Sequence, residues 1–243
     1  KISVDSALQT SQNYIQITQP NDELSYTNSL STKINLEGFN INKIDDYLQV
    51  NSSLYQTNHK NEDTETLPKV LPSIKYYSGN AIVRGTNYNN LYEFYNIFRD
   101  RNSDIHSRNQ QKISHKLNIS RELINFNSKI TFNSEIYNQL FMTEDKLLEG
   151  NKFHSGNYYR FFPIIGTKFE TPFKTKNNKF DLTYNPNLQL VISPGSSNTN
   201  KISNEDSSNN SYTLDNISSI NRYSGTDRMD NSKRISYGFD VYN

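Results

Sequence analysis

The residue types that most often carry out catalysis or bind metal ions are few in this chain, and they are scattered. The sequence contains no cysteine, which excludes thiolate metal sites, disulfides and cysteine nucleophiles. The histidines lack the H-x-x-H or H-x-x-x-H spacing that would bring two imidazoles to one metal ion. They are His59, His106, His115 and His154. We expect solvated histidines, no metal site and no cofactor.

Hydroxyl and carboxyl groups give no catalytic pattern either. Serine is frequent, but the sequence has no G-x-S-x-G nucleophile elbow. Two acidic groups fall in predicted loops, where solvated turns are far more common than paired carboxylate chemistry or a divalent-cation site. They are Glu62, Asp63 and Glu65, and Glu144, Asp145 and Glu149. The sequence therefore predicts that the protein is not an enzyme.

Composition excludes further classes. The 243 residues include 26 Lys and Arg against 25 Asp and Glu, so charge gives no argument for a nucleic-acid partner. The longest apolar run, Phe161 to Ile165, is far shorter than the roughly 20 residues of a membrane helix. A mean hydropathy of −0.84 is typical of a soluble protein. Insertion into a membrane would therefore require strands rather than helices.

The elements that must position the side chains are strands with one apolar and one polar face. Between residues 180 and 194 the even positions are Phe, Leu, Tyr, Pro, Leu, Leu and Ile, whereas the odd positions are mostly polar. Similar alternation is found at 30–36, 113–120, 129–140 and 235–241, and less cleanly at 158–173. The spacing of Leu91, Phe94, Tyr95 and Phe98 fits a helix as well as a strand, and we assign a strand.

The connections between these strands alternate in length. From residue 99 onward the predicted breaks are 99–110, 123–128, 143–156, 174–178 and 194–233, in the order long, short, long, short, long. Transmembrane β-barrels have long outer loops at one end and short periplasmic turns at the other. Several predicted strands exceed the roughly 9 to 11 residues that cross a bilayer, so they would project beyond it.

Two all-β architectures fit this pattern. A bilayer offers no water to unpaired backbone groups, so a polar chain can cross it only as a closed sheet whose outer side chains face lipid and whose inner side chains face an aqueous lumen. A soluble antiparallel sandwich shows the same alternation, because one face of each sheet meets solvent. Periodicity alone leaves both open.

Motifs in the last fifth of the chain favour the barrel. Asn204-Glu-Asp-Ser, Leu214-Asp-Asn, Asn221-Arg-Tyr-Ser-Gly-Thr-Asp-Arg and Arg234-Ile-Ser-Tyr-Gly follow one another in this order. In order and spacing they resemble the C-terminal signature of the LptD family of LPS-assembly outer-membrane proteins. Upstream segments such as Tyr159-Arg-Phe-Phe-Pro and Asn185-Pro-Asn-Leu-Gln-Leu look like barrel segments of that family. The resemblance covers 67–243, whereas 1–66 has only compatible strand patterning.

The resemblance singles out a set of signature residues with a structural role or a place on the LPS path. They are Asn204, Asp206, Ser207, Asn221, Arg222, Tyr223, Ser224, Gly225, Asp227, Arg228, Arg234, Tyr237 and Gly238. The chain departs from the family pattern at Ile217-Ser218, where Leu-Phe is usual, and at Thr226, where an aromatic residue is common. Well-studied members also join the barrel to the periplasmic domain by disulfides, for which this chain has no cysteine.

The resemblance implies a fold, a location and partners. We expect residues 1–243 to form part of one antiparallel transmembrane β-barrel in the outer membrane of a Gram-negative bacterium, with 194–233 as a long outer loop. A signal peptide, a periplasmic jellyroll domain and further strands are expected outside this sequence. The implied partners are lipopolysaccharide, outer-membrane lipids, an LptE-like lipoprotein plug and the periplasmic Lpt bridge proteins. The implied function is insertion of LPS into the outer leaflet through a laterally opening barrel.

The segment from Asn221 to Arg228 allows two interpretations. Ser224-Gly225 is a turn signal, and Arg222, Asp227 and Arg228 could form a buried ion-pair network that folds the long loop onto the lumen. The arginines could instead bind LPS phosphates. We favour the structural interpretation, because polar networks in long loops more often serve packing.

Two other functions remain as alternatives. A nonspecific outer-membrane channel or autotransporter-type barrel would share the strand pattern, but it should lack the signature at 221–228. A soluble β-rich adhesin or glycan-binding module would share the alternation, but it should remain dissolved without detergent.

Overall fold

The computed structural model describes residues 1–9, 11, 14–58, 63–103, 105–177, 180–195, 198–208, 213 and 216–242. In this part of the chain nearly all regular structure is β, arranged in a single sheet of twelve strands. The elements are β1 (Ile2–Ser6), α1 (Tyr14–Thr18), η1 (Glu23–Tyr26), β2 (Ser29–Phe39), β3 (Tyr47–Thr57), η2 (Thr64–Thr66), β4 (Lys69–Tyr77), β5 (Ala81–Val83), β6 (Thr86–Phe98), β7 (Asn109–Asn125), β8 (Ser128–Leu148), β9 (Lys152–Glu170), β10 (Phe173–Asn177), β11 (Phe180–Ile192) and β12 (Lys233–Tyr242).

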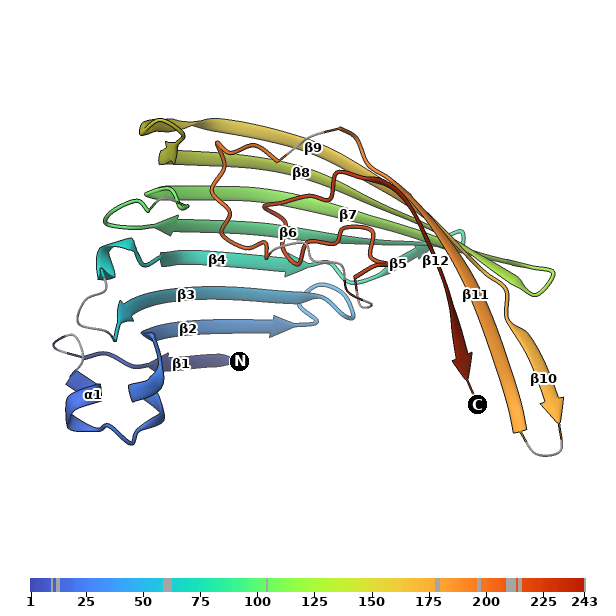
Figure 1. Cartoon of the computed structure of the whole chain (residues 1–243), viewed down its shortest axis with the longest axis horizontal. Helices are drawn as coiled ribbons and strands as arrows, with labels where there is room; N and C mark the ends of the chain where they lie inside the picture. Colours follow the sequence, from blue (N-terminus) through green and yellow to red (C-terminus); the bar gives the residue numbers. More distant parts are fainter. Residues whose placement is uncertain are drawn as a thin grey trace.

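The sheet is an antiparallel meander in which most strands pair with the next strand along the chain, whereas β4 pairs with β6 and β9 pairs with β11. The short β5 pairs with the beginning of β6, and β10 pairs with the first half of β11. The second half of β11 pairs with β9, and β12 pairs with the opposite side of β11. In Figure 1 the sheet is arched, and β11 and β12 curve away from the plane of β2–β8 at one end. The sheet does not close on itself within the described residues, which fits part of a β-barrel.

A long coil leads from β11 back to β12. We call residues 193–232 the returning coil, the sheet face that it covers the inner face, and the opposite side the outer face. Figure 1 shows the coil, in orange and red, running over β6–β9 before it enters β12. Hydrogen bonds from β6, β7, β8 and β9 to coil residues show that this is a contact.

The predicted all-β antiparallel fold is confirmed, and so is the strand assigned to 91–98, which lies in β6. The tight turn predicted at 123–128 is Phe126-Asn127, where both residues have positive φ, as in a two-residue hairpin loop. The prediction of a break at 174–178 was wrong for most of its length, because Lys174 to Asn177 belong to β10. The short helices α1, η1 and η2 were not predicted.

The prediction of a long loop at 143–156 was also wrong. Strands β8 and β9 run through this region and leave only residues 149–151 as the turn, with positive φ at Gly150 and Asn151. The polar residues that suggested a loop lie on paired strands with an irregularity between Thr143 and Lys146, where Asp145 has positive φ. The backbone pairing of β8 and β9 continues through this polar stretch, so both strands extend beyond the part in which one face is apolar.

We call the sheet inverted relative to that of a soluble protein, because its covered inner face is mainly polar and its exposed outer face is mainly apolar. On β7 the Lys112 side chain is 1% exposed, whereas the adjacent Ile113 is 51% exposed. On β9 the inner residue Phe162 is buried, whereas its neighbour Phe161 is exposed, and on β11 Gln189 is buried between exposed Leu188 and Leu190. Polar groups thus lie under the coil, and apolar groups face outward.

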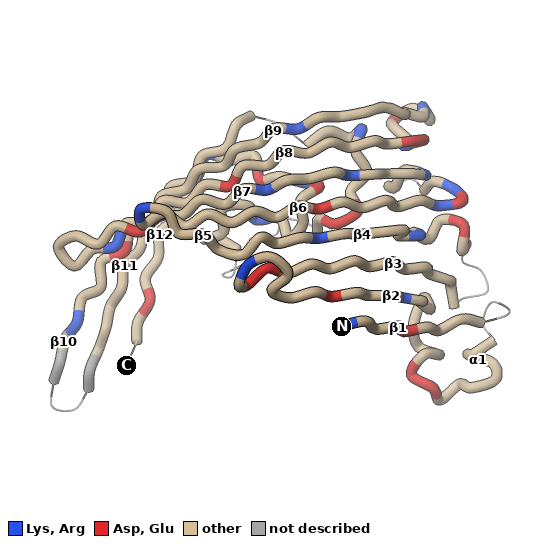
Figure 2. The backbone as a smooth tube through the Cα atoms, turned by 180° about the vertical axis from the view of Figure 1, so that it is seen from behind, with Lys and Arg blue, Asp and Glu red and all other residues tan. Residues whose placement is uncertain are grey.

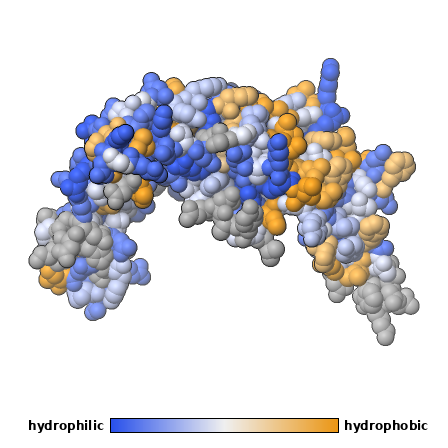
Figure 3. Space-filling model, turned by 45° about the horizontal axis from the view of Figure 1, so that its top comes forward, coloured by the Kyte–Doolittle hydropathy of each residue, from blue (hydrophilic) through white to orange (hydrophobic). Residues whose placement is uncertain are grey.

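An apolar row crosses the outer face from strand to strand. The registers pair its members in sequence: Ile2, Leu36, Val50, Ile74, Phe94, Ile113, Leu140 and Tyr159. In the space-filling view of Figure 3, apolar side chains gather on the right, whereas the left end of the molecule is mainly hydrophilic. A continuous apolar surface of this extent is typical of a membrane or protein contact.

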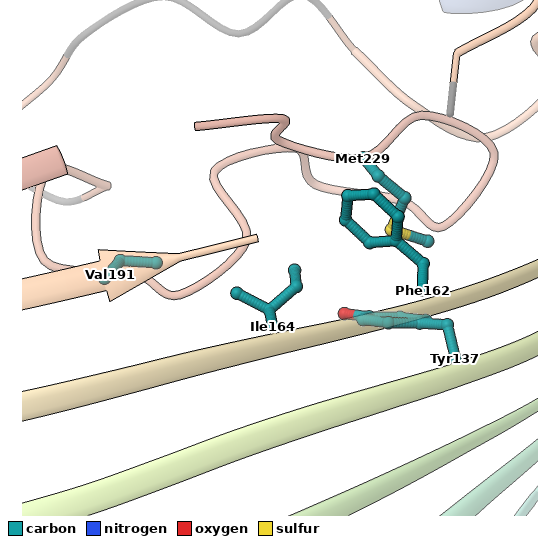
Figure 4. Close-up of a cluster of buried hydrophobic side chains, with 5 residues drawn as sticks. All are labelled: Tyr137, Phe162, Ile164, Val191 and Met229. Atoms are coloured by element: carbon teal, nitrogen blue, oxygen red, sulfur yellow. The ribbon is translucent and has the colours of Figure 1, made fainter. Parts of the chain in front are cut away.

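The largest apolar contact on the inner face is small and includes the coil. Tyr137, Phe162, Ile164, Val191 and Met229 form a buried cluster, and Ile220 packs against it. Figure 4 shows Met229 of the returning coil beside the Phe162 ring of β9. The coil is therefore anchored by apolar packing at this point, but most of its contacts are polar.

Candidate functional site

The main polar feature of the structure is a charged network between the inner face and the returning coil. Because side chains alternate along a strand, five long polar side chains from four adjacent strands point to the same side. They are Tyr95 of β6, Gln110 and Lys112 of β7, Gln139 of β8 and Arg160 of β9, and all are less than a tenth exposed. The coil residues above them carry most of the signature.

Lys112 is the cation at the centre of this network. Its Nζ lies 2.7 Å from Asp206 Oδ2 and 2.8 Å from Asp227 Oδ1, and it donates to Thr226 Oγ1 at 2.8 Å. The ammonium lies 4.6 Å from the centre of the Tyr95 ring, and the Tyr95 hydroxyl donates to Asp227 at 3.0 Å. One strand lysine therefore pairs with two carboxylates that are 21 residues apart in the coil.

Two more strand side chains bind the backbone of the coil. Arg160 Nη1 donates to the Asp227 carbonyl at 2.9 Å, and its Nη2 donates to the Thr226 carbonyl at 2.5 Å. Gln139 accepts from Arg160 Nε at 2.8 Å and donates to the Thr226 carbonyl at 3.1 Å. These contacts fix the coil at residues 226 and 227 directly over β8 and β9.

Separate ion pairs fix the coil at Glu205 and, close to its end, at Asp230. Arg99, just after β6, makes a bidentate pair with Glu205, with a shortest N–O distance of 2.6 Å. Arg222 makes a bidentate pair with Asp230 at 2.6 and 2.9 Å, and Arg234 at the start of β12 pairs with the same carboxylate. The pairs are nearly buried on both sides, so solvent screens them little.

A close contact explains why the signature has a glycine at residue 225. A Cβ on Gly225 would lie 2.3 Å from the Asp206 carbonyl oxygen and 2.4 Å from Asp206 Oδ1. The close approach lets Asp206 Oδ1 accept the backbone N–H of Thr226 at 3.0 Å and of Asp227 at 2.8 Å. The hydroxyl of Ser207 accepts the N–H of Asp227 and of Arg228 at 3.1 and 3.0 Å. The segments 204–207 and 224–228 thus form one folded unit.

The network sets the protonation of the coil carboxylates. Burial opposes ionisation of Glu205, but His106 and Arg99 outweigh it and lower the pKa of Glu205 to about 2. Burial also opposes ionisation of Asp206, but Lys112 and the surrounding donors hold its pKa well below the usual range. Burial raises the pKa of Asp227 even though Lys112 lies beside it. Two of the three carboxylates, Glu205 and Asp206, therefore stay negatively charged at acidic pH.

The structure brings most of the predicted signature residues together in the returning coil. Asn204 closes a turn with Ser207, the Asn221 amide oxygen accepts the Asp230 N–H at 3.0 Å, and the Ser224 hydroxyl contacts Ser208. Tyr223 lies with Ser224 and Gly225 on the wall of a cavity of about 320 Å³. Tyr237 and Gly238 belong to β12, where the Tyr237 side chain is 86% exposed on the outer face. Leu214, Asp215, His59 and Glu62 lie outside the described residues.

The ion-pair partners differ from those expected. The sequence suggested one network of Arg222, Asp227 and Arg228, but Asp227 pairs with Lys112 and Arg222 pairs with Asp230. Arg228 donates to the carbonyls of Thr199 and Ile202 at 2.9 and 3.5 Å. The physical reason is that the sheet supplies its own cation beneath the coil.

Sequence reasoning missed the strand half of this site. Lys112, Arg160, Gln110 and Gln139 lie on faces that the alternation marks as polar, which is also what a water-filled lumen would give. The available signal was side-chain length, since large amide and cationic side chains recur at neighbouring inner positions. Glu205 lies inside the quoted motif but was not singled out.

The contacts of the network position the returning coil on the sheet. No group of three or more His, Asp or Glu residues in the described part of the chain is placed to hold a metal ion. The buried cations of the network all contact carboxylates or carbonyl oxygens, as side chains that fix a coil would. Among the described residues no helix is long and apolar enough to span a membrane.

Comparison with known proteins identifies the family. The family model for LptD, described as LPS transport system D, matches residues 1–242. The search of curated proteins gave no match. The family is a transport component of the outer membrane of Gram-negative bacteria, and its role involves LPS and other Lpt proteins. With a match over nearly its whole length and a partial antiparallel barrel that carries the signature in its returning coil, this chain belongs to the LptD family.

Proposed function

We propose that this chain forms part of a multi-pass outer-membrane barrel that inserts lipopolysaccharide into the outer leaflet through a lateral opening. The observation that carries this proposal is the inverted sheet in a chain of the LptD family. Exposed apolar side chains such as Ile113 and Phe161 suit hydrocarbon, whereas buried polar side chains such as Lys112 and Arg160 suit the inside of a barrel.

In this proposal the two faces handle the two parts of an amphipathic cargo. The acyl chains of LPS leave sideways into the bilayer through a seam between barrel strands, while the sugars cross on the polar inner side. No covalent step is required. An LptE-like lipoprotein would occupy the lumen, and the periplasmic Lpt bridge would deliver LPS from below.

The returning coil has a definite place in this mechanism. It covers β6–β9 on the inner face and is fixed by Lys112, Arg160 and Arg99, so it narrows the polar interior instead of leaving it open. This arrangement disfavours a nonspecific channel, which needs a free aqueous path. We assign the signature residues of the coil the structural role of holding this constriction in shape.

Depletion of the full-length protein in its own bacterium tests the proposal. We expect newly made LPS to disappear from the cell surface, as measured by surface labelling, and to return when the wild-type gene is expressed again. If surface LPS stays constant while uptake of small hydrophilic solutes falls, the protein is a channel and the proposal is wrong.

A further inference from the structure

The outer face carries an amphipathic groove on β6–β9. One part of this groove is an apolar hollow of about 390 Å³ whose lining includes Phe94, Ile113, Leu140 and Tyr159. Two residues further along each strand, toward the connections at 99–108 and 149–151, the next row on the same face is Asn96, Gln111, Met142 and Asn157. These residues line a second, polar hollow of about 700 Å³. The surface therefore changes from apolar to amide-rich over two residues along each strand.

The polar hollow offers hydrogen-bonding groups rather than free charge. Within the described residues the side-chain amides of Gln111 and Asn157 make no hydrogen bond to the protein, so their donors and acceptors are open to a ligand. The nearby cations are already paired, Lys69 with Asp100 at 2.6 Å and Arg108 with Asp145 at 3.2 Å. Figure 2 shows acidic and basic residues mixed at this end of β6–β9. Such a surface suits hydroxyl groups better than phosphate.

We propose that this groove binds a glycolipid from the membrane side, with acyl chains on the apolar hollow and the sugar headgroup on the amides of Asn96, Gln111 and Asn157. Phe98 at the rim gives a sugar ring an aromatic surface. This proposal rests on the proposed membrane insertion, but it concerns the outside of the barrel rather than the transport path. The bound lipid is a fixed neighbour of the transporter, not its cargo in transit.

Photo-crosslinking in cells tests where the glycolipid lies. A photoreactive amino acid replaces Met142 in the full-length protein, because Met142 lines the polar hollow between Gln111 and Asn157 and is not one of the proposed amide ligands. The control replaces Ile34, which is exposed on the outer face of β2 one row from the apolar row. Bulk lipid would label both positions equally. Because two or more side-chain hydrogen bonds hold the headgroup in the groove, we expect about tenfold more glycolipid crosslinking at position 142 than at position 34.

A variant pair tests the amides themselves. The double substitution Gln111→Leu with Asn157→Leu should lower the glycolipid that copurifies with the protein about tenfold, because the headgroup loses its hydrogen bonds. Ser52→Leu, at the level of Ile34 on β3, should leave it unchanged. Folded yield is compared for all variants, and only folded protein is counted.

The results separate this inference from the proposed function. Equal glycolipid crosslinking at 142 and 34, crosslinking of phospholipid alone at 142, or unchanged glycolipid in the double variant would overturn the groove proposal while LPS export stays normal. Absence of any lipid crosslink at both positions would instead overturn membrane contact of this face, and with it the proposed function.

Discussion

At the scale of single residues, the stability of the inner-face network depends most on Lys112. We predict that Lys112→Met lowers the free energy of unfolding by about 3–5 kcal/mol, because the fully buried carboxylate of Asp227 would lose its cation. Denaturant titration of the purified full-length protein in detergent measures this change.

Lys116→Met is the matched control for this substitution. Lys116 lies four residues further along β7 and pairs with Glu135 at 3.0 Å, but both side chains are 20% exposed. We expect a loss of about 1 kcal/mol or less. Equal losses of unfolding free energy in the two variants would show that the buried network stabilises the protein no more than a partly exposed ion pair does.

Gly225 tests the close approach within the signature. Gly225→Ala should destabilise the folded coil by about 1–3 kcal/mol, because the new methyl group would overlap the Asp206 backbone. Limited proteolysis of the coil is the measurement. Gly195→Ala is the control, since a Cβ there meets no atom within 4 Å. Equal cleavage of both variants would contradict the steric argument.

The signature residues show what a sequence can give at this scale. Gly225, Asp206 and Asp227 were identified from their motif, and each has a clear packing or pairing role. Lys112 and Arg160 were not identified, because a polar residue on an alternating strand looks the same whether it faces water or a carboxylate. Only the position of the coil distinguishes the two cases.

At the scale of elements, attachment of the returning coil should depend on pH. The folded pKa of Glu205, about 2, lies below its usual value of 4.5, so its contribution is complete above about pH 4.5 and is lost as the pH falls toward 2. Asp206 acts in the same direction, whereas Asp227, whose pKa is raised, offsets part of the loss. We predict increasing cleavage of the coil by an acid-active protease over this window.

Glu205→Gln separates this carboxylate from the others. The variant cannot ionise at residue 205, so its cleavage should change less between pH 4.5 and 2 than that of the wild type. Coil cleavage that stays constant over the same range in the wild-type protein would contradict the prediction.

Arg228 tests whether the coil serves assembly or transport. Arg228→Ala removes the hydrogen bonds to the carbonyls of Thr199 and Ile202, and we predict a lower yield of folded barrel with unchanged LPS export per folded molecule. Heat-modifiability on gels measures folding, and surface LPS measures export. Arg121→Ala, at an exposed position on β7, is the control. Normal folded yield with impaired export would contradict the structural role.

Most of the long strands could be predicted from the sequence, but β10, which lies in a predicted break, and some strand ends could not. Alternation located β7, β8, β9, β11 and β12, because one face of each strand is apolar. The extension of β8 and β9 to the turn at 149–151 was missed, since beyond the apolar band both faces are polar. The path of the returning coil depends on contacts with distant strands, and no local pattern encodes it.

At the scale of the whole molecule, the opposite character of the two sheet faces is the central feature. The apolar row continues across eight strands from Ile2 to Tyr159, which a soluble protein would have to cover. The inner face is covered by the molecule's own polar coil. The structure thus agrees with the LptD family match and with a sheet whose outer side meets hydrocarbon.

The adjacent residues Phe161 and Phe162 allow the most direct test of this claim. Phe161 is 56% exposed on the outer face, and Phe162 is 1% exposed on the inner face. Phe161→Trp and Phe162→Trp are prepared in full-length protein freed of other tryptophans and reconstituted into vesicles with brominated lipid. We predict strong fluorescence quenching for Phe161→Trp and little for folded Phe162→Trp. Equal quenching of the two variants, or none in either, would contradict the account.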